Sequence, residues 1–203
     1  MENTQNLTEG NILGSLVRFA VPVLLSLFLQ ALYGGVDLLV VGQFASTADV
    51  SGVATGSMLL QTMTMIVTGL AMGITVVVGE RIGRREPVQA GRAIGSGICL
   101  FGVCAVFLTA VMAGGAETLS VLMHAPEEAL SQTAAYVRIC GAGSVFIVAY
   151  NVLGAVFRGI GDSKTPLFTV AVACVINIAG DLLLVAGFHI CLLYTSPSPR
   201  DYA

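Results

Sequence analysis

Residues 15–41 read SLVRFAVPVLLSLFLQALYGGVDLLVV, an apolar stretch whose only charged residues are Arg18 and Asp37. About 20 apolar residues are enough for a helix to cross the hydrocarbon core of a bilayer, so this stretch is long enough to span a membrane. A surface helix of a soluble protein would instead alternate an apolar face with a charged one. The stretch therefore predicts a transmembrane helix.

Four further apolar stretches follow along the chain, at 51–79, 93–114, 133–157 and 165–189. The composition agrees, since 56% of the 203 residues are hydrophobic and only 10% are charged, whereas about a quarter of a soluble domain is charged. We expect an all-α, polytopic transmembrane helical bundle with the lipid bilayer as its surroundings. No basic block is present that would indicate a nucleic-acid partner.

Two connections between these stretches are basic, and the other two contain neither Lys nor Arg. The basic ones are 80–92, with Arg81, Arg84, Arg85 and Arg92, and 158–164, with Arg158 and Lys164. Because basic loops stay on the cytoplasmic side, the N-terminal segment 1–14 and both basic connections are predicted to be cytoplasmic. Arg138, near the outer end of the fourth stretch, either reaches the outer surface or pairs with a carboxylate in the bundle.

The end of the chain differs from what precedes it. Residues 191–201 read CLLYTSPSPRD, which resembles the translation of an adapter used in sequencing libraries. The Ser-Pro-Ser-Pro run follows a membrane helix without a natural transition. We therefore expect 191–203 to be a non-native tail and the natural sequence to leave off near Ile190, inside a longer protein, so that the helical lobe 15–190 is truncated.

Asp37 is a carboxylate within the first predicted span. An ionisable side chain at such depth is costly and normally faces the bundle interior or a water-filled cavity. Gln30, Tyr33 and Asp37 are three and then four residues apart, so they share one face of the helix. One polar stripe on an otherwise apolar helix indicates the wall of a cavity.

Asp181 is a second intramembrane carboxylate, late in the fifth span. Asn177 precedes it by four residues, so both side chains point the same way. Spans 1 and 5 run in the same direction. Asp181 lies ~24 Å along the helix from Thr165, and Asp37 ~27 Å from Phe19, at 1.5 Å per residue. If the two spans are neighbours, these oxygen ligands form one site suited to a proton or a hard cation. Asn151 in the fourth span is a weaker candidate, since membrane amides often only join helices.

With these residues in place, the chain resembles the multidrug and toxic compound extrusion (MATE) family of cation-coupled transporters over about 7–190. Three stretches carry the resemblance, namely Phe19–Pro22 with Gln30–Asp37 and Val41–Gly42, Val78–Gly83, and Asn151 with Arg158–Pro166. The resemblance implies twelve helices in two six-helix lobes around a cleft. This chain would then supply five spans of the first lobe, and the C-terminal lobe would be its missing partner.

The resemblance also implies a function and a set of sites. Family members export small organic, amphipathic compounds in exchange for Na⁺ or H⁺, without enzymatic chemistry or another cofactor, from a bacterial-type plasma (inner) membrane. By resemblance, Asp37, Asn177 and Asp181 are cation-coupling residues and candidate Na⁺ ligands. Asn151 matches a further polar position of the coupling site, and Gln30 and Tyr33 match cleft-lining positions for the substrate.

Two alternatives remain open from the sequence. A lipid-linked oligosaccharide flippase of the same superfamily would need a basic cleft, for which these spans supply almost no residues. An intramembrane aspartyl protease also uses two membrane aspartates, and Gly180–Asp181 matches part of its signature. However, Ile178 stands where that signature needs glycine, and no Tyr-Asp pair occurs at Tyr33–Asp37.

Overall fold

The computed structural model describes residues 12–44, 47–181 and 183, all of them in helices or the turns between them. For Asp37, Asp181 and a few other helical residues it describes the backbone only. Seven α-helices and one short 3₁₀ turn make up the described part: α1 Ile12–Phe44, α2 Thr47–Gly83, α3 Pro87–Gly114, α4 Ala116–Leu122, η1 Glu127–Ala129, α5 Leu130–Ala142, α6 Ser144–Gly159 and α7 Lys164–Asp181. The predicted all-α bundle is confirmed.

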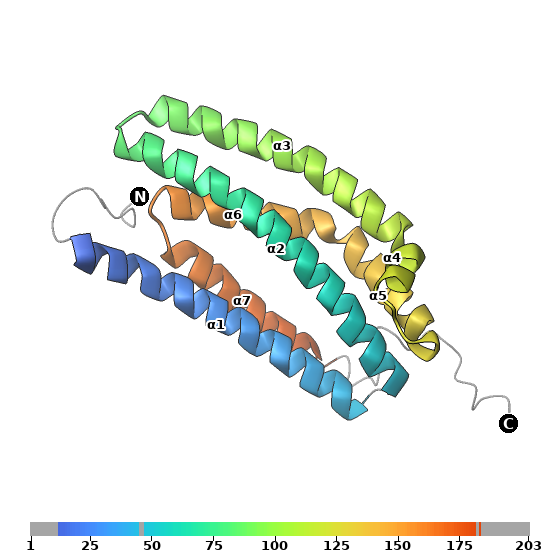
Figure 1. The fold of residues 1–203 in the computed structure, drawn as a ribbon. Helices are drawn as coiled ribbons and strands as arrows, with labels where there is room; N and C mark the ends of the chain where they lie inside the picture. The colour runs from blue at the N-terminus through green and yellow to red at the C-terminus, as the bar shows by residue number, and fades with distance from the viewer. Residues whose placement is uncertain (1–11, 45–46, 182, 184–203) are drawn as a thin grey trace, which may run out of the picture.

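The long helices alternate in direction, as Figure 1 shows. The start of α1, the α2–α3 turn and the α6–α7 turn all lie at one end of the bundle. These are the segments for which the distribution of Lys and Arg predicts a common, cytoplasmic side. α1, α2 and α3 are each long and apolar enough to cross a membrane. α1 and α2 extend beyond the predicted 15–41 and 51–79 at both ends, and α3 begins before the predicted 93–114 and ends with it.

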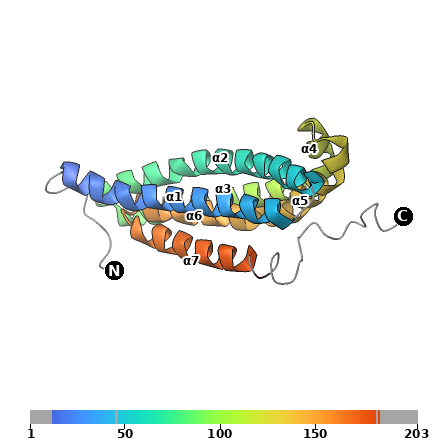
Figure 2. The same cartoon turned by 90° about the horizontal axis from the view of Figure 1, so that it is seen from below.

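The fourth predicted span differs from the single helix expected over 133–157. It consists of α5 and α6, which meet at Gly143 with a bend of 51°. Sharp bends occur at adjacent Gly and Ser residues, and Gly143 is followed here by Ser144. The predicted outer connection before it also contains a helix, α4, which with α5 projects at the far end of the bundle (Figure 2).

The fifth predicted span, 165–189, begins as α7 at Lys164. The helix is described as far as Asp181, so the end of this predicted span falls outside the described residues, Leu183 excepted. The same holds for the segment 1–11 and for the tail 191–203.

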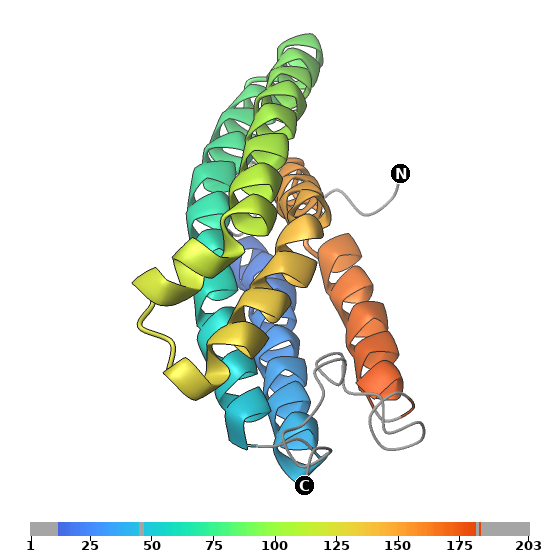
Figure 3. The same ribbon diagram turned by 90° about the vertical axis from the view of Figure 1, so that its right-hand side faces the viewer.

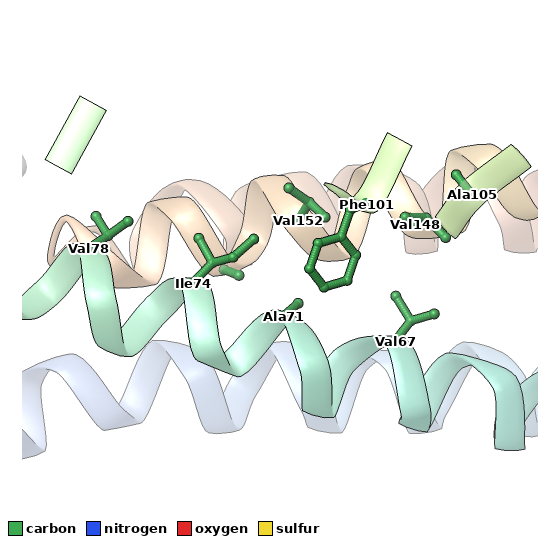
Figure 4. Close-up of a cluster of buried hydrophobic side chains, with 9 residues drawn as sticks. Val67, Ala71, Ile74, Val78, Phe101, Ala105, Val148 and Val152 are labelled. Atoms are coloured by element: carbon green, nitrogen blue, oxygen red, sulfur yellow. The ribbon is translucent and has the colours of Figure 1, made fainter. Parts of the chain in front are cut away.

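The core is formed by α2, α3 and α6. Val67, Ala71, Ile74 and Val78 of α2 face Phe101 and Ala105 of α3 and Val148, Val152 and Ala155 of α6. Figure 4 shows these side chains converging between the three helices. A second cluster, around Met63, Met112 and Val137, continues the core toward α4 and α5. Among the methionines of α2, Met63 is buried, whereas Met58, Met65 and Met72 are exposed.

α1 and α7 form a second group. They pack chiefly against each other, and few contacts join them to α2 and α6 within the described residues. In Figure 3, α7 stands well apart from α2 and α3. Both helices carry exposed apolar side chains, among them Leu24 at 63% and Phe168 at 72% exposure. This is the surface expected of helices that face lipid or further helices.

Candidate functional site

The two helices that carry the predicted acids are neighbours. α1 and α7 run side by side in the same direction (Figure 1), so the late turns of both helices lie toward the same end of the bundle. This is the arrangement under which Asp37, Asn177 and Asp181 were expected to form one site. The structure describes only the backbone of Asp37 and Asp181. These two residues are therefore placed by their positions along α1 and α7 alone.

Asn177 is the described member of this trio. Its side-chain oxygen Oδ1 is buried and accepts no hydrogen bond. A buried polar atom without a partner is costly, and native structures satisfy nearly all of them. An amide oxygen is also a ligand that hard cations prefer. The residue therefore fits a role in holding a cation or a protonated group between α1 and α7.

Tyr33 of α1 lies beside the same part of α7. Its phenol is within electrostatic interaction range of Cys174 on α7 and of Tyr150 on α6. Cys174 precedes Asn177 by one turn, so the two share a side of α7. The half-buried Tyr33 thus lies between the two helix groups, as a residue lining an internal cleft would. Gln30, one turn earlier and also half-buried, donates from Nε2 to the Ser26 carbonyl at 3.3 Å.

Asn151 lies in a different interface. Its Oδ1 accepts a 2.7 Å hydrogen bond from the Thr68 hydroxyl, and its Nδ2 donates to the Ile147 carbonyl at 2.8 Å. The residue is 8% exposed. These bonds hold the amide against α2, on the side of α6 that forms the core. Among the described side chains, Asn151 thus hydrogen-bonds to Thr68 of α2 and to none on α1 or α7.

Sequence reasoning missed the hydroxyl partners on α2. Thr75 donates to the Ala155 carbonyl at 2.9 Å, two turns beyond the Thr68–Asn151 bond on α2. Thr68 and Thr75 are seven residues apart and therefore share a helix face. The same interface is so close that a Cβ on Gly159 would lie 2.9 Å from Val78 Cβ. The seven-residue spacing of Thr68 and Thr75 in the sequence could have indicated this polar face of α2.

Arg138 pairs with a carboxylate, but at the surface of the bundle. Its Nη2 lies 3.2 Å from Glu117 Oε1, and both side chains are largely exposed. The expected pairing inside the bundle is therefore not what the structure shows, and the position of Arg138 at the outer face of the membrane stays a prediction. Exposed pairs of this kind contribute roughly 0–1 kcal/mol.

Asp162 shapes the connection before α7. Its carboxylate accepts from the backbone N–H groups of Lys164 and Thr165 and from the Thr165 hydroxyl at 2.6 Å. This is the bonding of a residue that caps a helix N-terminus. Burial raises the pKa of Asp162, but these hydrogen bonds outweigh it and leave the pKa below its usual value. The preceding Gly161 has φ 86°, a conformation that glycine adopts readily.

Comparison with known proteins places these features in context. The family model described as MatE matches residues 22–183. The chain is 28% identical over 189 residues to the probable multidrug resistance protein YpnP of Bacillus subtilis, covering 90% of this chain and 41% of that protein. It is 29% identical over 186 residues to the probable multidrug resistance protein YoeA of the same organism, covering 91% and 40%.

A solved structure described as the outward-facing conformation of a multidrug resistance MATE family transporter of the MOP superfamily has the same fold. It superposes with a TM-score of 0.86 at 23% identity, over 95% of this chain and 42% of that one. The chain thus spans about 40% of the length of the curated relatives it matches.

Proposed function

Since this chain belongs to the MatE family, we propose that it forms the first lobe of a cation-coupled exporter of drugs or other amphipathic organic compounds. The family is one of multi-pass membrane transporters and not of enzymes, which agrees with the apolar helices described above. Both Bacillus subtilis relatives are named for multidrug resistance. The flippase alternative is therefore not favoured, nor is the aspartyl protease.

The observation that carries the proposal is the pairing of α1 with α7 around the unsatisfied Asn177 oxygen. We assign Asp37, Asn177 and Asp181 to one coupling site for Na⁺ or H⁺. When either ion is bound, it neutralises carboxylate charge inside the membrane. Asp37, Asn177 and Asp181 would provide its oxygen ligands and would hold it between two helices that have few contacts with the rest of the lobe.

Coupling by this site would act through alternating access. A bound cation shifts the balance between two arrangements only if it binds one of them more tightly. α1 and α7 make few contacts with α2 and α6, so a change in their spacing disturbs little of the core. Tyr33 and Gln30, which lie on the same face of α1 as Asp37, would then contact the transported compound.

The proposed setting is a bacterial-type inner membrane with the N-terminus in the cytoplasm. The α2–α3 and α6–α7 turns share the end at which α1 begins (Figure 1), and both carry the basic residues that favour the cytoplasmic side. The remaining partner is the second lobe of the longer protein, which would complete the cleft.

The test uses the complete transporter, in which this chain continues into its downstream sequence. Asp37→Asn keeps the side-chain shape and removes the titratable charge. We expect drug efflux driven by a Na⁺ or H⁺ gradient to be abolished in membrane vesicles, while Glu117→Gln, at an exposed acid far along the chain, leaves it unchanged. Undiminished gradient-driven efflux by the Asp37→Asn protein would refute the coupling site.

A further inference from the structure

Arg158 is a half-buried cation in the last turn of α6. The sequence places it at the start of a basic cytoplasmic connection, where an arginine would be expected to extend into water. In the structure, the Arg158 side chain instead runs back toward the N-terminal end of α6. A Cβ built on Gly154 would lie 3.2 Å from Arg158 Nη1 and 3.8 Å from Cζ. The guanidinium therefore lies back along α6, over the bare backbone of Gly154.

Arg158 shares its face of α6 with a residue that approaches α1. Tyr150 is on the same helix face as Gly154 and Arg158, at intervals of four residues. It lies within electrostatic interaction range both of Arg158 and of Tyr33 on α1. Arg158 therefore belongs to the same side of α6 as the residues that approach α1.

No carboxylate compensates this charge within the described part of the chain. The neighbouring arginines at the same end of the bundle differ, because Arg81 pairs with Glu86 at 3.0 Å and Arg84 with Glu80 at 2.7 Å. Removing a cation from water without a partner is costly. A guanidinium in this position presents forked donors that match a carboxylate or a phosphate.

A role in capping α6 does not explain the conformation. The last carbonyls of α6 already accept backbone hydrogen bonds: Val156 from Ile160, Phe157 from Asp162 and Arg158 from Gly161. A capping arginine would also extend toward those carbonyls, which lie at the C-terminal end, whereas this guanidinium turns toward the N-terminal end of α6. The side chain is thus left available for a ligand.

We propose that Arg158, lying over Gly154, binds the anionic group of an amphiphile, a carboxylate or phosphate, on the face of α6 that carries Tyr150. The apolar remainder of the ligand would lie along Tyr150 and Tyr33. This inference rests on the proposed transport function for its biological role, but binding itself can be measured without transport. The anion could come from the transported compound or from a lipid headgroup.

The test uses two dyes that differ only in the anionic group, namely rhodamine B, which carries a free carboxylate, and its ethyl ester, which does not. Their affinities for the complete transporter in phosphatidylcholine nanodiscs are measured by fluorescence polarisation. We expect the acid to bind about tenfold more tightly than the ester, which corresponds to ~1.4 kcal/mol. Arg158→Gln should reduce this ratio to about one, and Arg158→Lys should give an intermediate ratio, because lysine keeps the charge without the fork.

Retained binding of the ester by Arg158→Gln shows that the variant is folded. Arg84→Gln removes an arginine from the same end of the bundle and should leave the ratio unchanged. A ratio near one in the parent protein, or a ratio unaffected by Arg158→Gln, overturns the proposal.

Repeating the measurement with phosphatidylglycerol in the nanodiscs separates the two sources of anion. A preference for the acid that persists identifies the transported compound as the ligand. If phosphatidylglycerol instead suppresses the preference of the parent protein for the acid, the headgroup phosphate is identified as the ligand. Both results place the anion at Arg158. Export assays are read separately: if neither dye is exported while the binding preference holds, the transport proposal fails and the binding site stands.

Discussion

The hydroxyl of Thr68 on α2 donates a 2.7 Å hydrogen bond to the amide oxygen of Asn151 on α6. The bond crosses the middle of the α2–α6 interface, beside the buried cluster of Val67 and Val148. An amide inside a membrane helix can have one of two roles, in ion coupling or in helix association. We expect helix association to be its role, because its hydrogen-bond partners are the Thr68 hydroxyl of α2 and the Ile147 carbonyl of its own helix.

Replacing Thr68 by the isosteric valine should therefore lower stability and leave coupling unchanged. Interhelical hydrogen bonds in membranes contribute ~0.6 kcal/mol on average and at most ~1.7 kcal/mol, so Thr68→Val should cost an amount in that range. The measurement is denaturation in mixed detergent micelles, with Asn151→Leu and the double variant completing a mutant cycle. Strictly additive effects of the two substitutions would show that the bond contributes nothing.

Asn177 should show the reverse behaviour. Its Oδ1 has no hydrogen bond to lose, so Asn177→Leu should leave the denaturation midpoint unchanged or raise it. The same substitution removes a proposed ion ligand, and we expect the dependence of efflux on the Na⁺ or H⁺ gradient to weaken at least tenfold in the complete transporter. Asn151→Leu is the matched control. Equal loss of gradient dependence in both variants would contradict the division of roles.

Gly159 is required for the close approach of α6 to α2. An added Cβ would lie 2.9 Å from Val78 Cβ and 3.1 Å from the Thr75 carbonyl oxygen. Gly159→Ala should therefore destabilise the bundle by about 1–3 kcal/mol, as overpacked cores do. Gly95→Ala is the control, because nothing lies within 4 Å of its added Cβ and alanine favours helix by ~1 kcal/mol. Thermal unfolding in detergent should separate the two variants in opposite directions.

Asp162 should make the stability of the α6–α7 connection dependent on pH. Because its folded pKa is depressed, its contribution is present above the unfolded pKa of about 3.9 and is lost as the pH falls through the folded value. Asp162→Ala should cost about 0.5–2 kcal/mol at pH 7, as loss of a helix cap does. The difference from the parent protein should shrink as the pH falls below about 4. A difference that stays constant down to about pH 2 would exclude the carboxylate as the cap.

The topology could be predicted from the sequence because it depends on the length of each apolar stretch and on the charges of the connections. Apolar length gave α1, α2 and α3, and the placement of Arg81, Arg84 and Lys164 correctly grouped the ends of the helices that share one side. The break at Gly143 was not predicted, because glycine is frequent throughout the chain and a composition cannot single out one Gly-Ser step.

The candidate site could be predicted only in part from the sequence. The depths of Asp37 and Asp181 placed them together only on the condition that their helices are neighbours, and the structure provides that adjacency. The rotation of α6 about its own axis was not available from the sequence. It decides that Asn151 contacts Thr68 while Tyr150, on another face of α6, lies near Tyr33 of α1.

The pairing of α1 with α7 has a consequence for synthesis. α1 is the first of these helices to leave the ribosome, yet it makes few contacts with α2, which follows it directly. Its principal neighbour emerges only after the rest of the described chain has been translated. During insertion, α1 therefore lacks its principal neighbour until α7 arrives, and the proposed coupling site is assembled in the last step of building this part of the lobe. Premature termination before Lys164 would leave Asp37 without its neighbouring helix.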